Sequence, residues 1–579
     1  MPTLDQTPVL RSQAVGRSSL DRREFLKHLA MAAPLVALNT GCQPMRRRGG
    51  DHFSELSADL VIIGGGLGGC AAALSAARSG LRVIMTEETA WIGGQLTQQA
   101  VPPDENQWVE TIGATRSYQA LRTAIRDHYR TQYPITARAR ANPRLNPGNC
   151  WVSRIGAEPR VMLAVLHAML APYVASAHVR ILQGYKAVRA DVHGDRVRAI
   201  SVRHIVTGHD ASLQAPFFVD ATELGDLLPM TGTEYVVGAE SQAMTGEPHA
   251  KPDYQPDNVQ GFTTCFAMDY LRGEDHVIPK PATYDVWRDK SLVGEDGQSY
   301  RLLSFDEPAN RRIGFSPEAR NGYWSYRRVL DRDLFAPGAF ASDVTIVNWG
   351  LNDYSFGTII DASDATVAYH LAQSKDLSRS LLYWLQTEAP RPDGGAGWKG
   401  LRLRPDIVGT EDGMAMYPYI RESRRIVAET TVLEQHVTTE ARIRDTGLDA
   451  RAVRAMPFDD AVGIGHYIMD LHLTTRGDRG RYGSTLPFQI PLGALLPKRM
   501  ENLLPAAKNL GVTHLTNGCY RLHPIEWNIG ESVGALIAFC RSRGTLPRAV
   551  RHTPALLRDY QAQLARDGIP LAWPAVLPT

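Results

Sequence analysis

Several side chains suited to proton transfer lie between residues 467 and 526. The candidate catalytic residues are Tyr467, His472, His514, His523 and Glu526. Asp470 stands two positions before His472, so on an extended strand these two side chains would share a face. Glu526 follows His523 closely enough to orient or activate it, and Tyr467 could donate a hydrogen bond to a substrate oxygen. These residue types suit general acid–base catalysis, although each histidine could equally be an ordinary core or surface residue.

Two further groups of charged residues leave alternatives open. Residues 421–425 read Arg-Glu-Ser-Arg-Arg. They could form a solvated helix face, or their guanidinium groups could bind an anionic substrate or hold the segment to its neighbours. Asp104 and Glu105 could act as a general acid and base, or could be an exposed pair in a loop.

The elements that would position these side chains begin with a nucleotide-binding pattern. The apolar run 59–63 suits a strand buried on both faces, and the alanine-rich segment 70–80 suits a helix that packs closely on a sheet. Between them, residues 64–69 contain the G-x-G-x-x-G turn, which brings a diphosphate to a helix N-terminus. A second strand, 81–86, leads to Glu87, which is placed to accept hydrogen bonds from a ribose and argues against a 2′-phosphate.

Three later segments favour FAD over NAD. Segment 91–97 follows the ribose acid, segment 217–226 is an apolar strand that runs into Asp-Ala-Thr, and 502–506 leads to a final helix that includes 529–534. No second G-x-G-x-x-G with its own strand and helix occurs, so we expect no nicotinamide-binding domain. The residues assigned to FAD are Gly64, Gly65, Gly66, Leu67, Gly68, Gly69, Glu87, Glu88, Gly93, Gly94, Gln95, Thr97, Ala221, Thr222, Gly225, Asn528, Ile529 and Gly530.

These segments make the chain resemble the FAD-dependent oxidoreductase family of the glutathione-reductase-like superfamily. The matching segments are 91–97, 419–426, 467–472, 487–491, 511–514 and 520–534. The resemblance implies an enzyme with bound FAD whose flavin faces a substrate domain. It also implies that the approach to the last helix, which His514 and His523 flank, passes near the isoalloxazine ring.

The expected fold class is α/β. It consists of a Rossmann-like FAD-binding domain of the glutathione-reductase type, with three layers (ββα), and an inserted α+β substrate or cap domain. Residues 57–235 and 401–579 should form the FAD-binding domain, the second part with a C-terminal extension. Residues 236–400, rich in Trp, Tyr, Pro and Gly, should form the cap. Segment 179–204 suits a β-hairpin with its turn at 194–195.

Residues 1–41 resemble a twin-arginine export signal. Arg22 and Arg23 precede a short apolar stretch, and Cys42 resembles the lipid-modified cysteine of bacterial lipoproteins, with 42–56 as a tether. We expect an exported protein, either periplasmic or anchored on the outer side of the inner membrane or at the outer membrane. It would touch a membrane only through a lipid at Cys42. The alternative is an amphipathic N-terminal helix of a cytoplasmic protein.

Charge and cysteine spacing exclude several function classes. The chain holds 63 basic and 61 acidic residues, and without residues 1–41 it would hold 58 of each. We therefore expect no nucleic-acid partner. No two of the six cysteines are three positions apart, which excludes the CxxC pattern of dithiol, zinc and iron–sulfur centres, and we expect no metal. The heterodisulfide-reducing branch of the family, which carries cysteine clusters, is excluded on the same ground.

These observations favour an exported FAD-dependent dehydrogenase or oxidase. It would take a hydride from a CH–OH group of a small sugar or polyol, or from a CH–NH group, onto flavin N5, with a histidine as base. Electrons would pass to an external acceptor such as oxygen, a quinone or a periplasmic carrier. Two alternatives stay open: a flavin-dependent reductase of activated C=C bonds, and a lyase or polysaccharide-binding lipoprotein in which FAD is structural.

Overall fold

The computed structural model describes residues 54–575, apart from residues 295 and 482–483. The export signal expected at residues 1–41 and the lipidation site expected at Cys42 lie outside the described residues. Within the described part, no helix is both long enough and apolar enough to cross a membrane.

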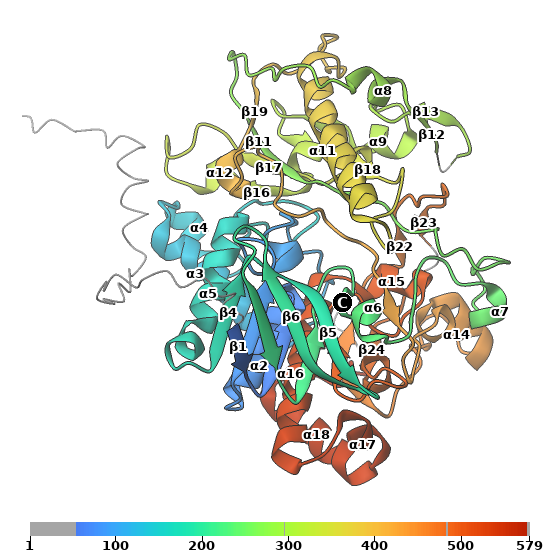
Figure 1. Ribbon diagram of the computed structural model, residues 1–579. Coiled ribbons are helices and arrows are strands. Elements are labelled where there is room, and N and C mark those ends of the chain that lie inside the picture. The colour runs from blue at the N-terminus through green and yellow to red at the C-terminus, as the bar shows by residue number, and fades with distance from the viewer. Residues whose placement is uncertain (1–53, 295, 482–483, 576–579) are drawn as a thin grey trace, which may run out of the picture. The chain divides into compact units, whose positions relative to one another are not determined.

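A five-stranded parallel sheet forms the centre of the nucleotide-binding region (Figure 1). Its strands, in spatial order, are β25 (Leu503–Pro505), β8 (Phe217–Asp220), β2 (Leu60–Ile63), β3 (Val83–Glu87) and β4 (Val179–Gln183). The strands expected near residues 60, 85 and 218 are all present. Because all five strands run the same way, the carboxyl ends of β2, β3 and β8 meet at one edge, where α/β sheets bind nucleotides.

Helices cover one face of this sheet and a second sheet covers the other. Leu60 and Ile62 pack on the helix side, whereas Val61 and Ile63 face the second sheet, as the alternation of a strand requires. The main helices of the first face are α2 (Leu67–Arg78), α3 (Arg116–Gln132), α5 (Pro159–Ala175) and α16 (His523–Arg543). The second sheet contains β1 (Ser54–Ser57), β7 (Asp210–Gln214), β6 (Arg196–His204) and β5 (Tyr185–His193). Together they make three layers.

The hairpin expected at 179–204 is shorter than the sequence suggests. Strands β5 and β6 form it, and residues 194–195 make the turn as expected. The first part of the segment, β4, instead joins the edge of the parallel sheet beside β3. As an edge strand, β4 (Val-Arg-Ile-Leu-Gln) mixes apolar and polar residues as β5 and β6 do, so the local pattern does not assign it to the parallel sheet.

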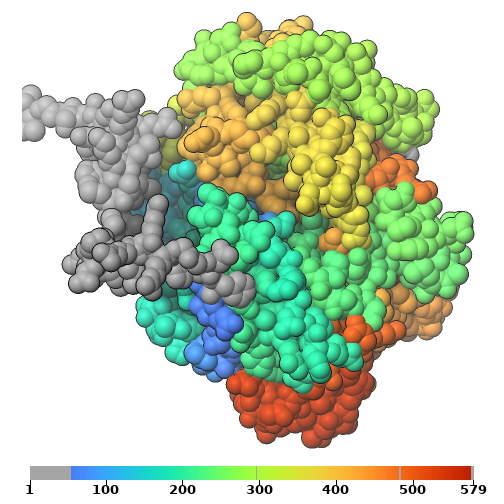
Figure 2. Space-filling view, viewed as in Figure 1, coloured from blue at the N-terminus to red at the C-terminus, as the bar shows by residue number. Residues whose placement is uncertain are grey.

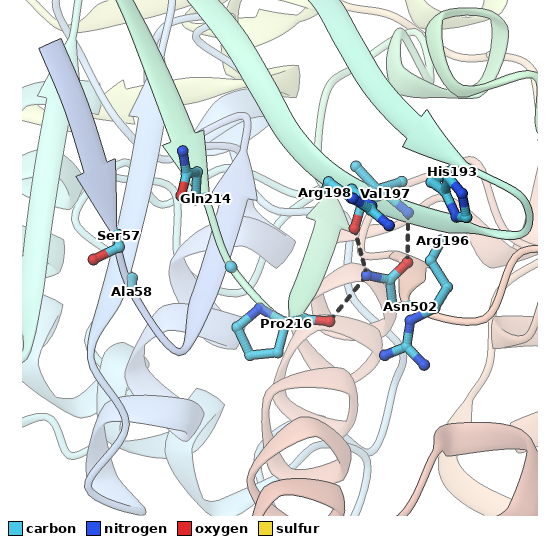
Figure 3. Close-up of a pocket in the computed structure, with 10 residues that line it drawn as sticks. Ser57, Ala58, His193, Arg196, Val197, Arg198, Gln214, Pro216 and Asn502 are labelled. Atoms are coloured by element: carbon cyan, nitrogen blue, oxygen red, sulfur yellow. Dashed lines mark hydrogen bonds between the residues drawn. The ribbon is translucent and has the colours of Figure 1, made fainter.

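Asn502, just before β25, fastens the two sheets together (Figure 3). Its side chain accepts a hydrogen bond from Val197 N–H (2.9 Å) and donates to Val197 O (2.8 Å) and Pro216 O (2.9 Å). A hollow of about 480 Å³ lies beside it. Since the amide is fully used by backbone groups, we assign Asn502 a structural role.

The cap is built around an antiparallel sheet and one long helix. The sheet contains β16 (Arg328–Leu330), β17 (Val344–Val347), β11 (Phe266–Tyr270) and β19 (Leu401–Leu403), and α11 spans Asp364–Thr387. Because β19 pairs with β11, this sheet extends just past the boundary expected at residue 400. Leu377, Leu381 and Leu385 recur every four residues on α11 and are fully buried. In Figures 1 and 2, the yellow α11 lies in the upper part of the view, and the red helices α17 (Pro547–His552) and α18 (Pro554–Asp567) lie at the bottom.

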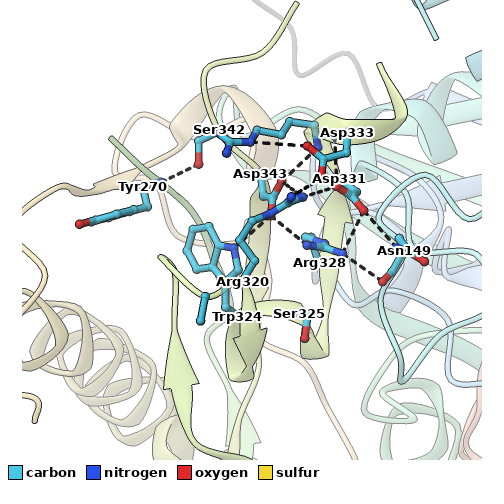
Figure 4. A network of polar contacts seen from close by, with 12 residues as sticks. Asn149, Tyr270, Arg320, Trp324, Ser325, Arg328, Asp331, Asp333, Ser342 and Asp343 are labelled. Carbon is cyan, nitrogen blue, oxygen red and sulfur yellow. Dashed lines mark hydrogen bonds and ion pairs between the residues drawn. The ribbon is translucent and has the colours of Figure 1, made fainter. Parts of the chain in front are cut away.

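A buried ion-pair network ties the cap sheet to the nucleotide-binding region (Figure 4). Arg328 of β16 donates to Asp343 (2.9 Å) and Asp331 (3.1 Å), and to the backbone oxygens of 148–149. Burying charges is favourable only when they are paired in this way. The network fixes the start of β16 and thereby the adjacent Arg327, whose side chain takes different partners.

The cysteines of the described chain are all buried and form no disulfide. They are Cys70, Cys150, Cys265, Cys519 and Cys540. Across the described residues, no three His, Cys, Asp or Glu side chains come together in a way that could hold a metal ion.

Candidate active site

The glycines of the turn 64–69 leave room on one side only. A Cβ would lie 2.3 Å from a backbone oxygen at Gly64, which has φ +98°, and 1.7 Å from one at Gly68. At Gly66, the nearest neighbours of a Cβ would be 3.2 Å away and include Glu223 Oε1. Gly66 is also the N-cap of α2. The open side of the turn therefore leads to a helix N-terminus, where a diphosphate binds best.

Glu87 ends β3 beside this turn, as the sequence predicts. Its Oε2 accepts Gly65 N–H (3.0 Å), and its Oε1 accepts Thr89 N–H (2.8 Å) and the Gln98 amide (3.1 Å). Burial raises the pKa of Glu87 to about 7, although the Thr89 hydrogen bonds oppose the shift. Glu87 and Glu88 both line a hollow that also includes Gly64 and Gly66. This position suits Glu87 to accept hydrogen bonds from the hydroxyl groups of a ribose.

Four buried side-chain atoms near the turn have no hydrogen-bond partner within the described chain. They are Gln95 Oε1, Gln98 Oε1, Gln99 Nε2 and Glu223 Oε1. Buried polar atoms are costly unless they are paired. The ribose and ribityl hydroxyls and the ring carbonyls of FAD offer donors and acceptors of the kinds these atoms need. The residues present therefore fit the cofactor.

Three more of the residues assigned to FAD lie against the turn. A Cβ at Gly94 would be 3.0 Å from Gly66 Cα, and Ala221 supplies the backbone oxygen that faces Gly64. Gln95 donates to Arg521 O (3.2 Å) and bonds to a carboxylate of α16. The turn, the segment after β3 and the start of α16 thus form one site.

Other residues assigned to FAD are engaged elsewhere. Asn528 bonds to β21 (Ala461–Gly465), and a Cβ at Gly530 would lie 2.0 Å from Gly68 O, so Gly530 allows α16 to pack closely on α2. The remaining positions make local hydrogen bonds, turns or core contacts: Leu67, Gly69, Gly93, Thr97, Thr222, Gly225 and Ile529.

Glu526 faces the glycine turn rather than the histidine it was expected to activate. Its Oε1 accepts Gly68 N–H (3.2 Å), and Lys508 Nζ lies 3.8 Å from its Oε2. Burial raises the pKa of Glu526, whereas Lys508 opposes the shift. The two side chains share no hydrogen bond, because the ring of His523 is held by Asp104 N–H and Val101 O. We therefore assign Glu526 to the residues that surround the glycine turn, where the cofactor would bind.

His523 is fully buried and does not reach a substrate pocket. Its Nδ1 accepts Asp104 N–H (3.2 Å), and its Nε2 lies 3.2 Å from Val101 O. Burial lowers its pKa to about 3, even though the Asp104 carboxylate acts in the other direction. A histidine that is neutral and has both ring nitrogens engaged is unsuited to serve as the base.

Because the fold holds His523 neutral, we expect the free energy of unfolding to fall as the pH drops. In the unfolded chain this histidine titrates near 6.5, and in the fold near 3, so the unfolded state binds more protons between these values. The stabilisation is complete above pH 6.5 and is lost as the pH falls towards 3, by up to about 1.4 kcal/mol per pH unit. The free energy of unfolding, measured with urea between pH 7.5 and 4.5, should fall less steeply with decreasing pH in His523→Asn than in the wild type, by the equivalent of about one proton. The same dependence on pH in both proteins would contradict this expectation.

His514 and the charged segment 421–425 form a buried network. His514 Nδ1 lies 3.0 Å from Glu422, which also pairs with Arg425 at 2.5 Å. Although burial acts against it, His514 and Arg425 lower the pKa of Glu422 to about 2. The segment is therefore not a solvated helix face; its charges hold it to neighbouring elements. His514 is committed to this network and does not line the pocket described next.

Asp104 and Glu105 are also buried rather than exposed. Asp104 accepts two hydrogen bonds from Arg327, both 3.2 Å, and Glu105 pairs with Arg122 at 2.9 Å. The interpretation of these acids as an exposed loop pair is wrong, because each has an arginine that compensates its burial.

A pocket of about 180 Å³ gathers the polar side chains that a substrate could reach. Its polar lining residues are Asp104, Arg327, Tyr419, Tyr467, Asp470, His472 and Arg521. Leu522, the N-cap of α16, also lines it, so the pocket lies at the start of the helix that carries Glu526 to the glycine turn. The pocket shares Trp151 and His472 with a wide cleft of about 1240 Å³ that extends along the cap.

His472 is the predicted histidine that lies in this pocket. Its Nδ1 is 2.5 Å from Asp353 Oδ2, its Nε2 is 3.5 Å from Asp470 Oδ2, and its side chain is 28% exposed. As predicted, Asp470 and His472 lie together. The short strand β22 (Asp470–Leu471) ends just before the ring, and Gln260 accepts the backbone N–H of His472 (3.2 Å).

Asp353, in β18 (Asp353–Tyr354), keeps this histidine in one orientation. Burial alone would raise the pKa of Asp353, but Arg421, His472 and Thr263 outweigh it and lower the pKa to about 2. The ionised carboxylate can only accept, so Nδ1 of His472 must be the donor. That tautomer leaves Nε2 as the basic nitrogen.

Tyr467 lines the same pocket, as a substrate-binding role requires. Burial, followed by Asp104 and Asp470, raises its pKa well above the usual value, so the hydroxyl stays protonated and can donate. Asp353, Arg327, Tyr419 and Arg521 were not recognised as site residues. They come from four separate segments, and no local pattern in the sequence links them.

Comparisons with known proteins agree with the nucleotide-binding geometry. A family profile described as FAD dependent oxidoreductase matches residues 59–564. The alpha subunit of sarcosine oxidase from Corynebacterium sp. (strain P-1) is 27% identical over 213 residues, 34% of this chain and 21% of that subunit. The match thus spans about a fifth of that relative's length.

Solved structures show only distant likeness. p-Nitrophenol 4-monooxygenase from Pseudomonas putida is 11% identical, with a TM-score of 0.33 over 90% of this chain and 88% of that one. The quinol fumarate reductase subunit FrdA of E. coli is 10% identical, with a TM-score of 0.29 over 89% of this chain and 74% of that one.

Proposed function

The chain belongs to the family of FAD-dependent oxidoreductases, and we propose that this enzyme is a dehydrogenase or oxidase with His472 as its base. The observation that carries the proposal is the Asp353–His472 pair in a pocket at the start of α16. The three-layer arrangement supports a nucleotide-binding domain of the glutathione-reductase type. Donors to such an enzyme carry a CH–OH or CH–NH group.

When bound, FAD supplies the oxidising group that accepts a hydride. Nε2 of His472 takes the hydroxyl or amine proton as the neighbouring C–H bond gives up its hydride, so the donor becomes a C=O or C=N compound. Asp353 orients the ring and stabilises the imidazolium that forms. Tyr467 donates a hydrogen bond to the substrate oxygen. Both electrons then leave to an external acceptor: oxygen, a quinone or a periplasmic carrier.

Two observations bear on the donor. Similarity to a sarcosine oxidase subunit supports a CH–NH donor. Trp151 is 59% exposed at the mouth of the pocket, with its ring 4.7 Å from that of Tyr326, and such a platform suits the apolar face of a sugar. We therefore keep amines and polyols as the two donor classes.

The test is to follow the visible flavin spectrum of the holoenzyme anaerobically while sugars, polyols, amines and hydroxy acids are added in turn. Bleaching by one class would establish a dehydrogenase and its substrate type. If no donor bleaches the flavin, the proposal fails.

A reductase of activated C=C bonds is the second candidate, because Arg521 lines the pocket and a guanidinium group suits an unsaturated acid. In that case, chemically reduced flavin would be reoxidised by an unsaturated acid. A flavin that neither donors nor acceptors affect would indicate the structural role considered for a lyase or polysaccharide-binding lipoprotein.

We also propose that the protein is exported, on the strength of Arg22-Arg23 and the apolar stretch after it. Replacing both arginines by lysine should leave the FAD-loaded protein in the cytoplasm, whereas the wild type fractionates with the periplasm or membranes. Cys42→Ser tests the lipid anchor separately: it should release the exported protein from membranes. Identical fractionation of the arginine variant and the wild type would contradict export by this route.

A further inference from the structure

We propose that the substrate is a carboxylic acid whose carboxylate pairs with Arg521 while its hydroxyl or amine faces His472. The inference rests on the proposed function and narrows its donor to hydroxy acids and amino acids, including N-substituted ones. Arg521 and His472 line the same pocket, so one small molecule can contact both.

Arg521 is a buried cation without a carboxylate partner. Only 3% of the residue is exposed. Its Nη1 donates to Tyr419 OH (2.7 Å), its Nη2 makes a longer bond to Asp470 O (3.3 Å), and its Nε has no partner. No acidic side chain of the described chain lies within ion-pair distance of it. Burial acts to lower the pKa of Arg521, but Tyr419, Asp470, Tyr467 and Asp104 outweigh it. The charge is thus partly compensated from a distance, and a directly paired anion would stabilise it further.

The other buried arginines around the site differ in this respect. Arg327 is paired with Asp104, Arg421 with Asp353, and Arg425 with Glu422. Each of these pairs is already neutral, so none needs an anion from solution. Arg521 therefore stands out by its missing counter-ion and not by its residue type.

The surroundings of Arg521 favour a bound carboxylate. Arg521 directly precedes Leu522, the N-cap of α16, so the first turn of a 21-residue helix points its positive end towards the same place. Tyr419 holds the guanidinium in position through the bond from Nη1. Asp104 is paired with Arg327, and Asp470 lies beside His472.

Pocket size limits the substrate. The pocket is small, about 180 Å³, beside a cleft of about 1240 Å³. It suits the reacting end of an acid, with the carboxylate near the carbon that is oxidised. A longer chain on the substrate could extend past Trp151 into the wide cleft.

The experiment compares matched acids and neutral analogues on the holoenzyme. The probes are lactate and lactamide, N-methylglycine and N-methylglycinamide, and gluconate and glucitol, each tested for anaerobic flavin bleaching and for perturbation of the oxidised flavin spectrum. We expect the wild type to prefer the acid of at least one pair by about 10- to 100-fold. Arg521→Gln should abolish that preference, Arg521→Lys should keep part of it, and added guanidinium should restore part of it to Arg521→Gln.

Arg312→Gln is the matched control, because Arg312 lies in the wide cleft and not in the small pocket; it should leave the preference unchanged. Retained flavin and an unchanged melting temperature show that each variant is folded. If neutral analogues bleach the flavin as well as the acids do, with or without Arg521, this inference is overturned while the proposed function stands. If no compound bleaches it, the proposed function fails, and spectral binding of the acids to wild type and Arg521→Gln still decides whether the anion site exists.

Discussion

Replacing Gly66 by valine is expected to give a folded protein that does not retain FAD. A Cβ at Gly66 would lie 3.2 Å from both Ala221 O and Glu223 Oε1, so a side chain there needs much smaller shifts of its neighbours than the 1.7 Å contact at Gly68 would demand. That side chain would, however, fill the open side of the turn where the diphosphate approaches the N-terminus of α2. We expect FAD affinity to fall at least about 100-fold, or about 2.7 kcal/mol.

The measurement is FAD binding to the deflavinated protein, followed by quenching of FAD fluorescence, together with the circular dichroism of the variant. Gly66→Ala serves as the graded case and should lose less affinity. Gly68→Ala is the contrast, because its Cβ would lie 1.7 Å from a backbone oxygen and should prevent correct packing. A yellow Gly66→Val protein at full occupancy would refute the assignment of the turn.

His472→Gln should retain FAD but reduce it about 10²- to 10⁴-fold more slowly, the usual contribution of a general base. The variant removes Nε2, the nitrogen that carries no proton when Nδ1 donates to Asp353 and that lies 3.5 Å from Asp470 Oδ2. Asp353→Asn should show a loss of similar size, because an amide can donate to Nδ1 and so place the ring proton on Nε2. Single-turnover reduction of the flavin by the identified donor measures both effects.

His523→Asn and His167→Gln are the controls for His472. Both histidines lie outside the pocket, the first fully buried and the second on α5. Their reduction rates should stay within a few-fold of the wild type. If His523→Asn were the slow variant and His472→Gln reacted normally, the assignment of the base would be wrong.

The nucleotide-binding half was predictable because its signals are local. The strand, glycine turn, helix and second strand follow one another between residues 60 and 87, and each obeys its own short-range rule. Even there, the sequence does not show which residues of α16 face the glycine turn. Asn528 and Gly530 pack against neighbouring elements, whereas Glu526, which was assigned to catalysis, contacts the turn.

The acid–base site was predictable only in part because it depends on distant pairings. The sequence does not distinguish the three histidines His472, His514 and His523. They differ in the structure because distant segments bury His514 and His523 and leave His472 partly exposed. Asp353 meets His472 across 119 positions, and Arg521 is distinguished only by the lack of a counter-ion. Neither relation leaves a trace in local composition or spacing.

The buried, unpaired cysteines have a practical consequence for how this protein can be studied. The thiols are spread widely: Cys70 is in α2, Cys265 lies next to β11 in the cap, and Cys540 is near the end of α16. A thiol-reactive dye can modify them only when their surroundings open, and mass spectrometry can then identify which peptide reacted first. The buried thiols thus report the local opening of the cap and of the cofactor domain separately.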